Sequence, residues 1–218
     1  MKRKFLSVLS LLLCALFVLG GCGGAKEETN ENEQQTQTPN QGAEITNKGD
    51  ENVENTYVEI KMKDGGEIVV ELLPEYAPKT VEFFLELVED KYYNGLTFHR
   101  AVKEFMIQGG SPNGDGIGGC GRTVVGEFFS NGYENRLSHT RGVISMARTM
   151  VKDSASGQFF IMHGDANYLD GEYAAFGRVV SGMEVVDKIA ESPVNGEMLV
   201  EQPVIKSVKI LKNYKTEE

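Results

Sequence analysis

Short apolar segments, separated by glycine-rich and polar loops, recur through the middle of the chain and constrain its fold more than any other feature. They read TFHRAV, FMIQG, GVISMA, QFFIM and AAFGRVV. Short runs of this kind, bounded by turn residues, are typical of strands. A hairpin is predicted before them, where TYVEIKM and EIVVELL flank the turn Asp64-Gly65-Gly66, and a last strand is predicted at VIKSVKIL.

Two further segments have helical periodicity. The stretch KTVEFFLELVED follows Pro78, with apolar residues at helical spacing and glutamates on the other side, and MEVVDKIAES predicts a second helix. These helices do not alternate with the strands as they do in βαβ units. We therefore predict a mainly β fold, built as an antiparallel sheet or barrel.

The N-terminus has the pattern of a secretory signal peptide. A basic start at residues 2–4 precedes an apolar run from Phe5 to Leu19, which is too short for a comfortable membrane span. The run ends in Leu-Gly-Gly-Cys22, which resembles the lipobox of bacterial lipoproteins. That resemblance implies that residues 1–21 are removed, that Cys22 carries lipid such as palmitate, and that the protein is anchored to the cell membrane facing outside the cytoplasm. An ordinary signal peptide with a chance cysteine is the alternative.

An acidic, polar segment follows the cysteine. Residues 23–56 contain two lysines and eight carboxylates, and almost no large apolar side chain. Such a composition cannot offset the entropy of ordering, so residues 22–56 are predicted to be a flexible tether. Much of the net charge of −10 lies there. No basic patch appears elsewhere, which argues against nucleic-acid binding. Residues 57–214 then form one predicted domain, followed by a polar tail at 215–218.

The cysteines and histidines give no indication of a cross-link or a metal site. Cys14 would leave with the signal peptide and Cys22 would carry lipid, so Cys120 alone remains in the folded part and no intramolecular disulfide is expected. The three histidines have no zinc-ligand spacing.

The loop GGSPNGDGIGGCG superficially resembles two ligand-binding motifs. It contains G-x-G-x-x-G but no helix is predicted after it, and Arg122 stands where a calcium loop needs glutamate. No serine lies in a nucleophile elbow either. No metal and no cofactor are therefore expected.

The segment FHRAVKEFMIQGG, residues 98–110, places Arg100 and Gln108 among large apolar residues. Charged and amide groups are costly to bury without partners, so these two either point to solvent or face a cleft. The segment resembles the signature of the cyclophilin family of peptidyl-prolyl isomerases. SASGQFFIM and YLDGEYAAFGRV resemble two further motifs of that family, in the right order. The resemblance implies a closed eight-stranded antiparallel barrel capped by two helices.

The resemblance also implies roles for individual residues. Arg100 would be the catalytic arginine, with Gln108 beside it in the cleft. The substrate would be a proline-containing segment of an unfolded or exported protein, bound by Phe105, Met106, Gln158, Phe160, Leu169, Tyr168 and Tyr173. Phe159 is assigned to the core, because it alternates with Phe160 along a strand.

The chemistry accounts for the residue types. Rotation about an amide has a barrier of about 18–20 kcal/mol because resonance must be broken. In the twisted state the proline nitrogen bears a lone pair, so a fixed cationic donor binds that state better than either planar form. Arg100 can act in this way without exchanging a proton.

Three positions depart from residues common in the family. Tyr168 replaces a tryptophan, Tyr173 a histidine and Arg148 an asparagine. The change at Tyr168 implies weakened binding of the cyclic peptide cyclosporin A. We expect a membrane-anchored isomerase that assists the folding of exported proteins. The alternative is a proline-peptide-binding or holdase module with little turnover.

Overall fold

A computed structural model describes residues 56–212, 214 and 215 of the chain. The predicted signal peptide, the predicted lipidation site Cys22, the predicted tether before Thr56 and residues 216–218 of the predicted tail lie outside the described residues. No helix within the described part is long and apolar enough to span a membrane.

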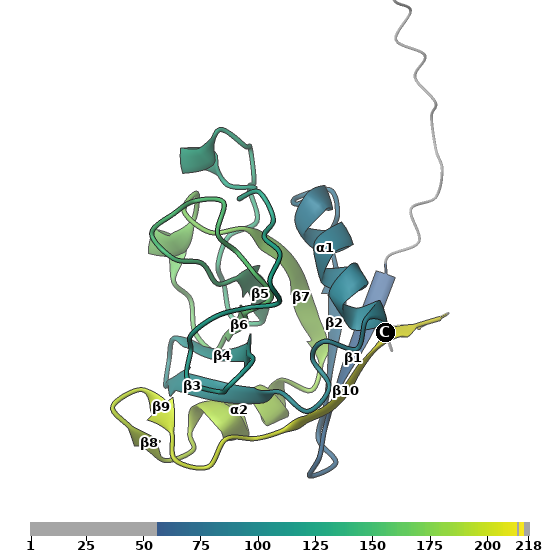
Figure 1. Ribbon diagram of the computed structural model, residues 1–218, viewed down its shortest axis with the longest axis vertical. Coiled ribbons are helices and arrows are strands. Elements are labelled where there is room, and N and C mark those ends of the chain that lie inside the picture. Colours follow the sequence, from purple (N-terminus) through teal and green to yellow (C-terminus); the bar gives the residue numbers. More distant parts are fainter. Residues whose placement is uncertain (1–55, 213, 216–218) are drawn as a thin grey trace, which may run out of the picture. The chain divides into compact units, whose positions relative to one another are not determined.

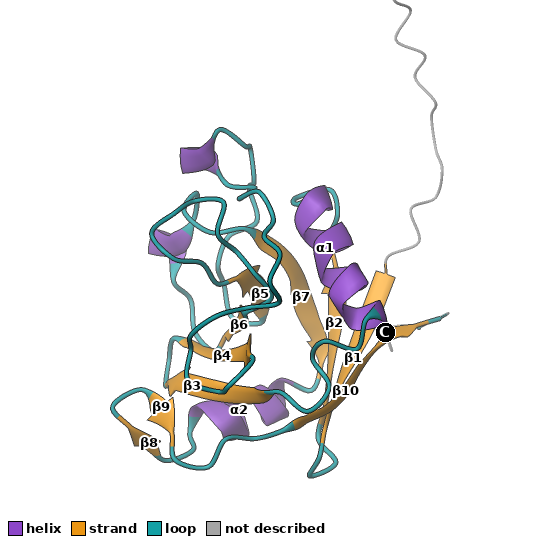
Figure 2. Cartoon of the chain, in the orientation of Figure 1, coloured by secondary structure: helices purple, strands orange, loops and turns teal. Residues whose placement is uncertain are grey.

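The described residues form a mainly β fold with two α-helices and two short 3₁₀ helices (Figures 1 and 2). In chain order the elements are β1 (Thr56–Met62), β2 (Glu67–Leu72), α1 (Pro78–Glu89), β3 (Thr97–Val102), β4 (Met106–Ser111), η1 (Phe129–Asn131), β5 (Val143–Met146), β6 (Phe159–Met162), η2 (Asn167–Leu169), β7 (Ala175–Ser181), α2 (Met183–Ala190), β8 (Val194–Asn195), β9 (Met198–Leu199) and β10 (Ile205–Leu211). Every strand and helix expected from the periodicity is present, whereas β8, β9 and the 3₁₀ helices were not predicted.

The strands form one antiparallel sheet of ten, in the order β10-β1-β2-β7-β5-β6-β4-β3-β9-β8. The expectation of a closed eight-stranded barrel is therefore wrong. The start of β3 meets the segment before β10 through an isolated bridge between Thr97 and Val204 rather than through a ladder. Pro203 accepts a hydrogen bond from the Phe98 N–H at 3.0 Å, but it has no N–H of its own to continue the pairing.

The two helices pack at different parts of the sheet. Helix α1 contacts β7 and β10, while α2 contacts β2, β3 and β4 (Figure 1). Pro78 lies in the first turn of α1, and the buried carboxylate of Glu127 accepts hydrogen bonds from the N–H groups of Lys79 and Thr80 at 3.1 and 2.8 Å. A distant loop therefore caps the helix N-terminus, where backbone donors have no partner within the helix.

The buried apolar residues form two clusters. We call the larger one the main core; it contains Phe159, whose ring makes T-shaped contacts with the rings of Phe84, Tyr93 and Phe98 at 5.9, 5.4 and 5.7 Å. The prediction that Phe159 faces the core is confirmed. The smaller one, which we call the cavity cluster, consists of Met106, Val143, Phe160, Met162, Ala166, Leu169 and Ala175.

Candidate active site

A cavity of about 290 Å³ opens over the cavity cluster. Seven of the nine catalytic and substrate-binding residues predicted from the sequence line it: Arg100, Phe105, Met106, Gln108, Phe160, Leu169 and Tyr173. Strand pairing brings them together, because Arg100 on β3 faces Gln108 on β4, which faces Phe160 on β6. Residues far apart in the chain therefore share one surface.

The apolar wall of the cavity is held by packing. The side chains of Met106, Phe160 and Leu169 are buried, with 1 %, 5 % and 9 % of their surface exposed. The ring of Phe160 stacks on His139 at 6.0 Å and meets the ring of Tyr173 edge-on at 5.7 Å. The wall is thus a preformed apolar surface large enough for a small ring.

The polar edge of the cavity is a chain of hydrogen bonds. Arg100 Nη1 donates to Gln108 Oε1 at 3.0 Å, and Gln108 Nε2 donates to Gln158 Oε1 at 2.9 Å. Gln158 Nε2 in turn donates to the carbonyls of Gly116 and Gly118 at 3.0 and 2.8 Å. The glycine-rich loop therefore orients both glutamines, which agrees with a structural rather than a ligand-binding role for its glycines.

Two of the predicted binding residues lie outside this cavity. Gln158 lines an adjoining cavity of about 310 Å³, which shares Gln108, Ala147 and Arg148 with the first. Tyr168 is 73 % exposed and stacks on Phe105, with ring centroids 6.0 Å apart. Tyr168 is therefore placed at the rim, next to a residue that lines the cavity.

Glu197 contacts Arg100 and was missed by sequence reasoning. Its Oε2 accepts a hydrogen bond from Arg100 Nε at 2.7 Å. Glu197 lies between β8 and β9, two strands of two residues each. The Asn195-Gly196 pair is a turn signal that could have indicated this hairpin, but no local pattern indicates that the hairpin docks beside Arg100.

Arg148 contributes more to the cavity than its departure from the family pattern suggested. Its guanidinium lies between two rings, 5.0 Å from the centroid of Phe128 and 4.7 Å from that of Tyr173. Its Nε and Nη2 donate to the carbonyl of Glu172 at 3.0 and 2.7 Å, and Nη1 donates to the Thr149 carbonyl at 2.8 Å. Arg148 therefore links two loops to each other. It also lines the cavity.

His139 and Ser145 are buried behind Phe160 and form an array with Asp170, whose side chain is 35 % exposed. His139 Nδ1 is 2.8 Å from Asp170 Oδ1, and its Nε2 is 3.1 Å from Ser145 Oγ. Burial lowers the pKa of His139, and the hydrogen bond to Asp170 opposes this only in part. Ser145 is 0 % exposed, so its hydroxyl cannot reach a substrate and the array does not form a hydrolytic site.

His99 is the neighbour of Arg100 on β3 and is also buried, with 0 % of its surface exposed. Neither of its ring nitrogens has a hydrogen-bond partner among the described residues. Burial lowers the pKa of His99, and the charge of Arg100 lowers it further. His99 therefore favours the neutral form, which leaves Arg100 as the cation at this edge of the cavity.

Comparison with known proteins gives a consistent result. Residues 57–213 match the family described as cyclophilin type peptidyl-prolyl cis-trans isomerase/CLD. Human peptidyl-prolyl cis-trans isomerase-like 3 is 44 % identical over 133 residues, which is 61 % of this chain and 81 % of the human protein. Peptidyl-prolyl cis-trans isomerase B of Bacillus subtilis is 41 % identical over 140 residues, covering 64 % of this chain and 94 % of that protein.

Solved structures agree. A cyclophilin type peptidyl-prolyl cis-trans isomerase of Cryptosporidium parvum superposes with a TM-score of 0.67 at 30 % identity, covering 73 % of this chain and 99 % of the other. A second structure of that protein, determined in the presence of the dipeptide Ala-Pro, has a TM-score of 0.64 at 32 % identity and covers 72 % of this chain and 99 % of the other.

Proposed function

This chain belongs to the cyclophilin-type family and is a peptidyl-prolyl cis-trans isomerase; from that premise we propose that it acts on X-Pro bonds of exported proteins in the cavity beside Arg100. The observation that carries the site is the fixed guanidinium of Arg100 at the edge of an apolar cavity. The N-terminus has the pattern of a secretory signal peptide, which supports exported proteins as the substrates.

The proline ring of the substrate packs against the apolar wall formed by Met106, Phe160 and Leu169. Arg100 then donates toward the nitrogen lone pair that develops as the amide twists, and it stabilises the twisted state more than either planar form. Gln108 keeps the guanidinium oriented through its side-chain oxygen. No bond to the protein forms and no proton is exchanged, so the chemistry needs no nucleophile.

The lowering of the isomerisation barrier that this proposal requires is moderate. An uncatalysed X-Pro bond isomerises over tens to hundreds of seconds, and raising this rate by about five decades requires lowering the barrier by about 7 kcal/mol. A single preorganised donor contributes about 3–4 kcal/mol in other enzymes. Desolvation of the proline on the apolar wall and restraint of the peptide supply the remainder.

Replacing Arg100 tests this assignment. Arg100→Ala is expected to lower kcat/KM on a short proline peptide about a hundredfold, with the thermal unfolding midpoint little changed because the side chain faces the cavity. Arg100→Lys is also expected to be poor, since an ammonium lacks the planar fork. A protease-coupled assay gives the rates. Near-native turnover by the alanine variant would refute the role of Arg100.

The alternative, a proline-peptide-binding or holdase module with little turnover, makes a different prediction for the same assay. Such a module would bind proline peptides with the wild-type chain showing negligible turnover. The conjunction of Arg100, Gln108 and the apolar wall in one cavity favours the enzyme, because recognition alone does not need the arginine.

We place the enzyme outside the cytoplasm, held on the cell membrane through lipid on Cys22. Several acyl chains bind a membrane stably, whereas one binds marginally. Cys22→Ala is expected to release the protein from the membrane fraction or to leave an unprocessed precursor, as detected by immunoblotting and N-terminal mass spectrometry. Mature wild-type protein that is fully soluble, with an unmodified N-terminus, would contradict the anchor.

Tyr168 is proposed to weaken cyclosporin A binding while leaving peptide turnover intact. Its exposed ring covers Phe105 at the rim, where a tryptophan would offer a larger surface and an indole N–H. Tyr168→Trp is expected to gain about 1–2 kcal/mol of binding free energy, the scale of one hydrogen bond with its packing. Calorimetric titration of both forms decides this, and equal affinities would show that position 168 does not contact the drug.

A further inference from the structure

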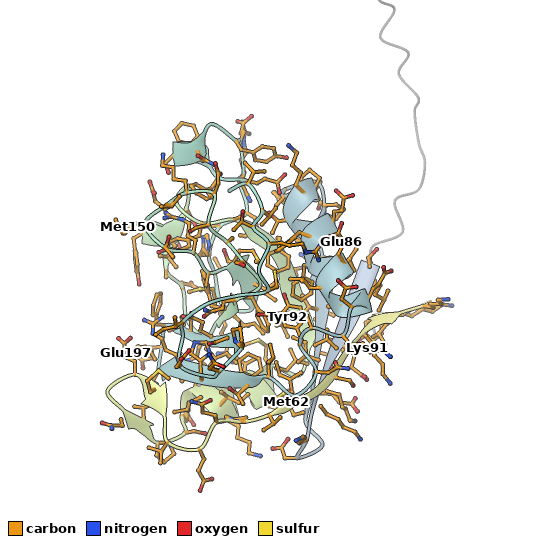
Figure 3. All side chains as sticks on the ribbon, viewed as in Figure 1. Met62, Glu86, Lys91, Tyr92, Met150 and Glu197 are labelled. Carbon is orange, nitrogen blue, oxygen red and sulfur yellow. The ribbon has the colours of Figure 1, made fainter. Side chains whose placement is uncertain are left out.

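The hairpin formed by β8 and β9 is docked directly on the residue proposed to catalyse the reaction. Met198 of β9 pairs with Arg100 of β3, and the Ala101 N–H donates to the Glu197 carbonyl at 2.9 Å. Gly196 takes a positive φ of 65°, which turns the chain just before Glu197. Figure 3 labels Glu197, which lies in the turn that joins β8 and β9.

The side chain of Glu197 completes the support of the guanidinium. Its carboxylate accepts from Arg100 Nε at 2.7 Å, while Nη1 of the same guanidinium donates to Gln108 and lies 3.7 Å from Met106 Sδ. Nη2 makes no hydrogen bond with the described residues. The guanidinium is thus held at two of its nitrogens, and the third is available to a substrate.

A carboxylate at this position could act in two opposite ways. It could lower the effective charge of the guanidinium, which would slow a reaction that depends on a cation, or it could hold the guanidinium in a productive orientation. The side chains of Arg100 and Glu197 are 31 % and 58 % exposed, so solvent screens the charge effect. Orientation is not screened, because it depends on the geometry of the hydrogen bond at Nε.

We propose that Glu197 is a positioning residue for catalysis: by binding Nε it fixes the rotation of the Arg100 guanidinium, so that Nη2 faces the twisted proline amide. This inference rests on the proposed function, which assigns the chemistry to Arg100. The short hairpin then has a role in catalysis besides the few residues that it adds to the sheet.

Separate measurement of kcat and KM tests the proposal. Glu197→Ala is expected to lower kcat about three- to five-fold, because a guanidinium without its hydrogen bond at Nε, a contact worth up to about 1 kcal/mol at this exposure, turns out of the productive orientation, and to leave KM for a proline peptide unchanged. Glu197→Gln should keep most of kcat, because its amide oxygen still accepts from Nε. NMR exchange measurements on a proline peptide give the rate in the bound state separately from affinity.

Glu191 provides a matched control. Its carboxylate lies 2.9 Å from Lys103 Nζ, and its side chain is 55 % exposed, close to the 58 % of Glu197. Glu191→Ala therefore removes a comparable surface ion pair of a β3-flanking lysine without contacting Arg100. It is expected to leave both kcat and KM unchanged.

A double variant shows whether Glu197 acts through Arg100. Adding Glu197→Ala to Arg100→Ala should cause no further loss of kcat. A wild-type rate in Glu197→Ala, an increased rate, or equal losses in the alanine and glutamine variants would each overturn the positioning role, while an inactive Arg100→Ala would still support the site. A fully active Arg100→Ala would overturn the role of Arg100, and negligible turnover by the wild-type chain would overturn the proposed isomerase function itself. Thermal unfolding midpoints establish that each variant is folded.

Discussion

Phe159 and Phe160 are neighbours on β6, yet they belong to two different regions of the molecule. Phe159 is 0 % exposed and is surrounded by aromatic rings of the main core. Phe160 turns to the other side of the strand, where it joins the cavity cluster and lines the cavity. Alternation of side chains along one strand therefore separates a residue that stabilises the fold from one that forms the site.

The two regions are held in different ways. The main core is packed on all sides, so its side chains keep one another in place. The cavity cluster borders a cavity of about 290 Å³. On that side its side chains have no packing partner. Polar groups support it from behind instead: His139 stacks on Phe160, and Arg148 lies against Tyr173. A preformed site requires such a supporting layer.

Truncation in the main core is expected to give the largest effect. Phe159→Ala should lower the free energy of unfolding by about 3–5 kcal/mol, because it removes a fully buried ring and leaves a void. Urea denaturation followed by circular dichroism measures this. The kcat/KM of the fraction that remains folded should stay close to that of the wild type, since Phe159 faces away from the cavity.

Phe159→Leu serves as the control for that experiment, because it retains most of the buried volume and should cost much less stability. A Phe159→Ala protein with full stability would show that the ring is not packed as described. A large fall in kcat/KM with full stability would show instead that the two sides of β6 are not separate.

Truncation in the cavity cluster should have a smaller effect on stability and a larger one on activity. Phe160→Ala removes apolar surface that the proline ring would contact, worth about 1.5–3 kcal/mol, or about ten- to a hundredfold in kcat/KM. Its free energy of unfolding should fall by less than that of Phe159→Ala, because one side of the ring already faces a cavity. Parallel peptide assays and urea curves for the two alanine variants make the comparison directly, and equal losses of stability would argue against it.

Local patterns account for the elements that the sequence predicts well. Alternation and helical spacing locate β1, β2 and both helices, and the FHRAVKEFMIQGG segment identifies the strands that carry Arg100 and Gln108. These features depend on neighbouring residues, so they can be recognised without knowing the fold.

Contacts between distant segments could not be predicted in the same way. Glu197 meets Arg100 across 97 positions of sequence, and β8 and β9 are too short to show a periodicity. The open sheet depends on how Pro203 meets β3 in space. Arg148 was interpreted only as a departure from a family pattern, because its two ring contacts come from separate loops.

The polar layer of His139, Ser145 and Asp170 behind Phe160 gives the smallest and most specific expected effect, a loss of stability in mild acid. Burial lowers the pKa of His139 below its ordinary value of 6.5, so on acidification the unfolded chain takes up the proton first. Stability is then complete above about pH 6.5 and falls as the pH drops from there toward the folded-state pKa, by at most about 1.4 kcal/mol per pH unit for this group.

Replacing the imidazole by a side chain that does not titrate isolates this contribution. His139→Asn should cost some stability at pH 7.5, because the contacts with Asp170 and Ser145 are altered, but its free energy of unfolding should fall less steeply between pH 6.5 and 5.5. Part of the slope should persist, since burial lowers the pKa of His99 in the same direction. Urea midpoints at pH 7.5, 6.5 and 5.5 for wild type and variant measure the difference. Identical slopes would mean that the pKa of His139 is the same in the folded and unfolded states, so that burial does not lower it. A fall that is less steep in the wild type than in the variant would mean that the folded state raises the pKa of His139, and the imidazole would then be held as a cation in an ion pair with Asp170.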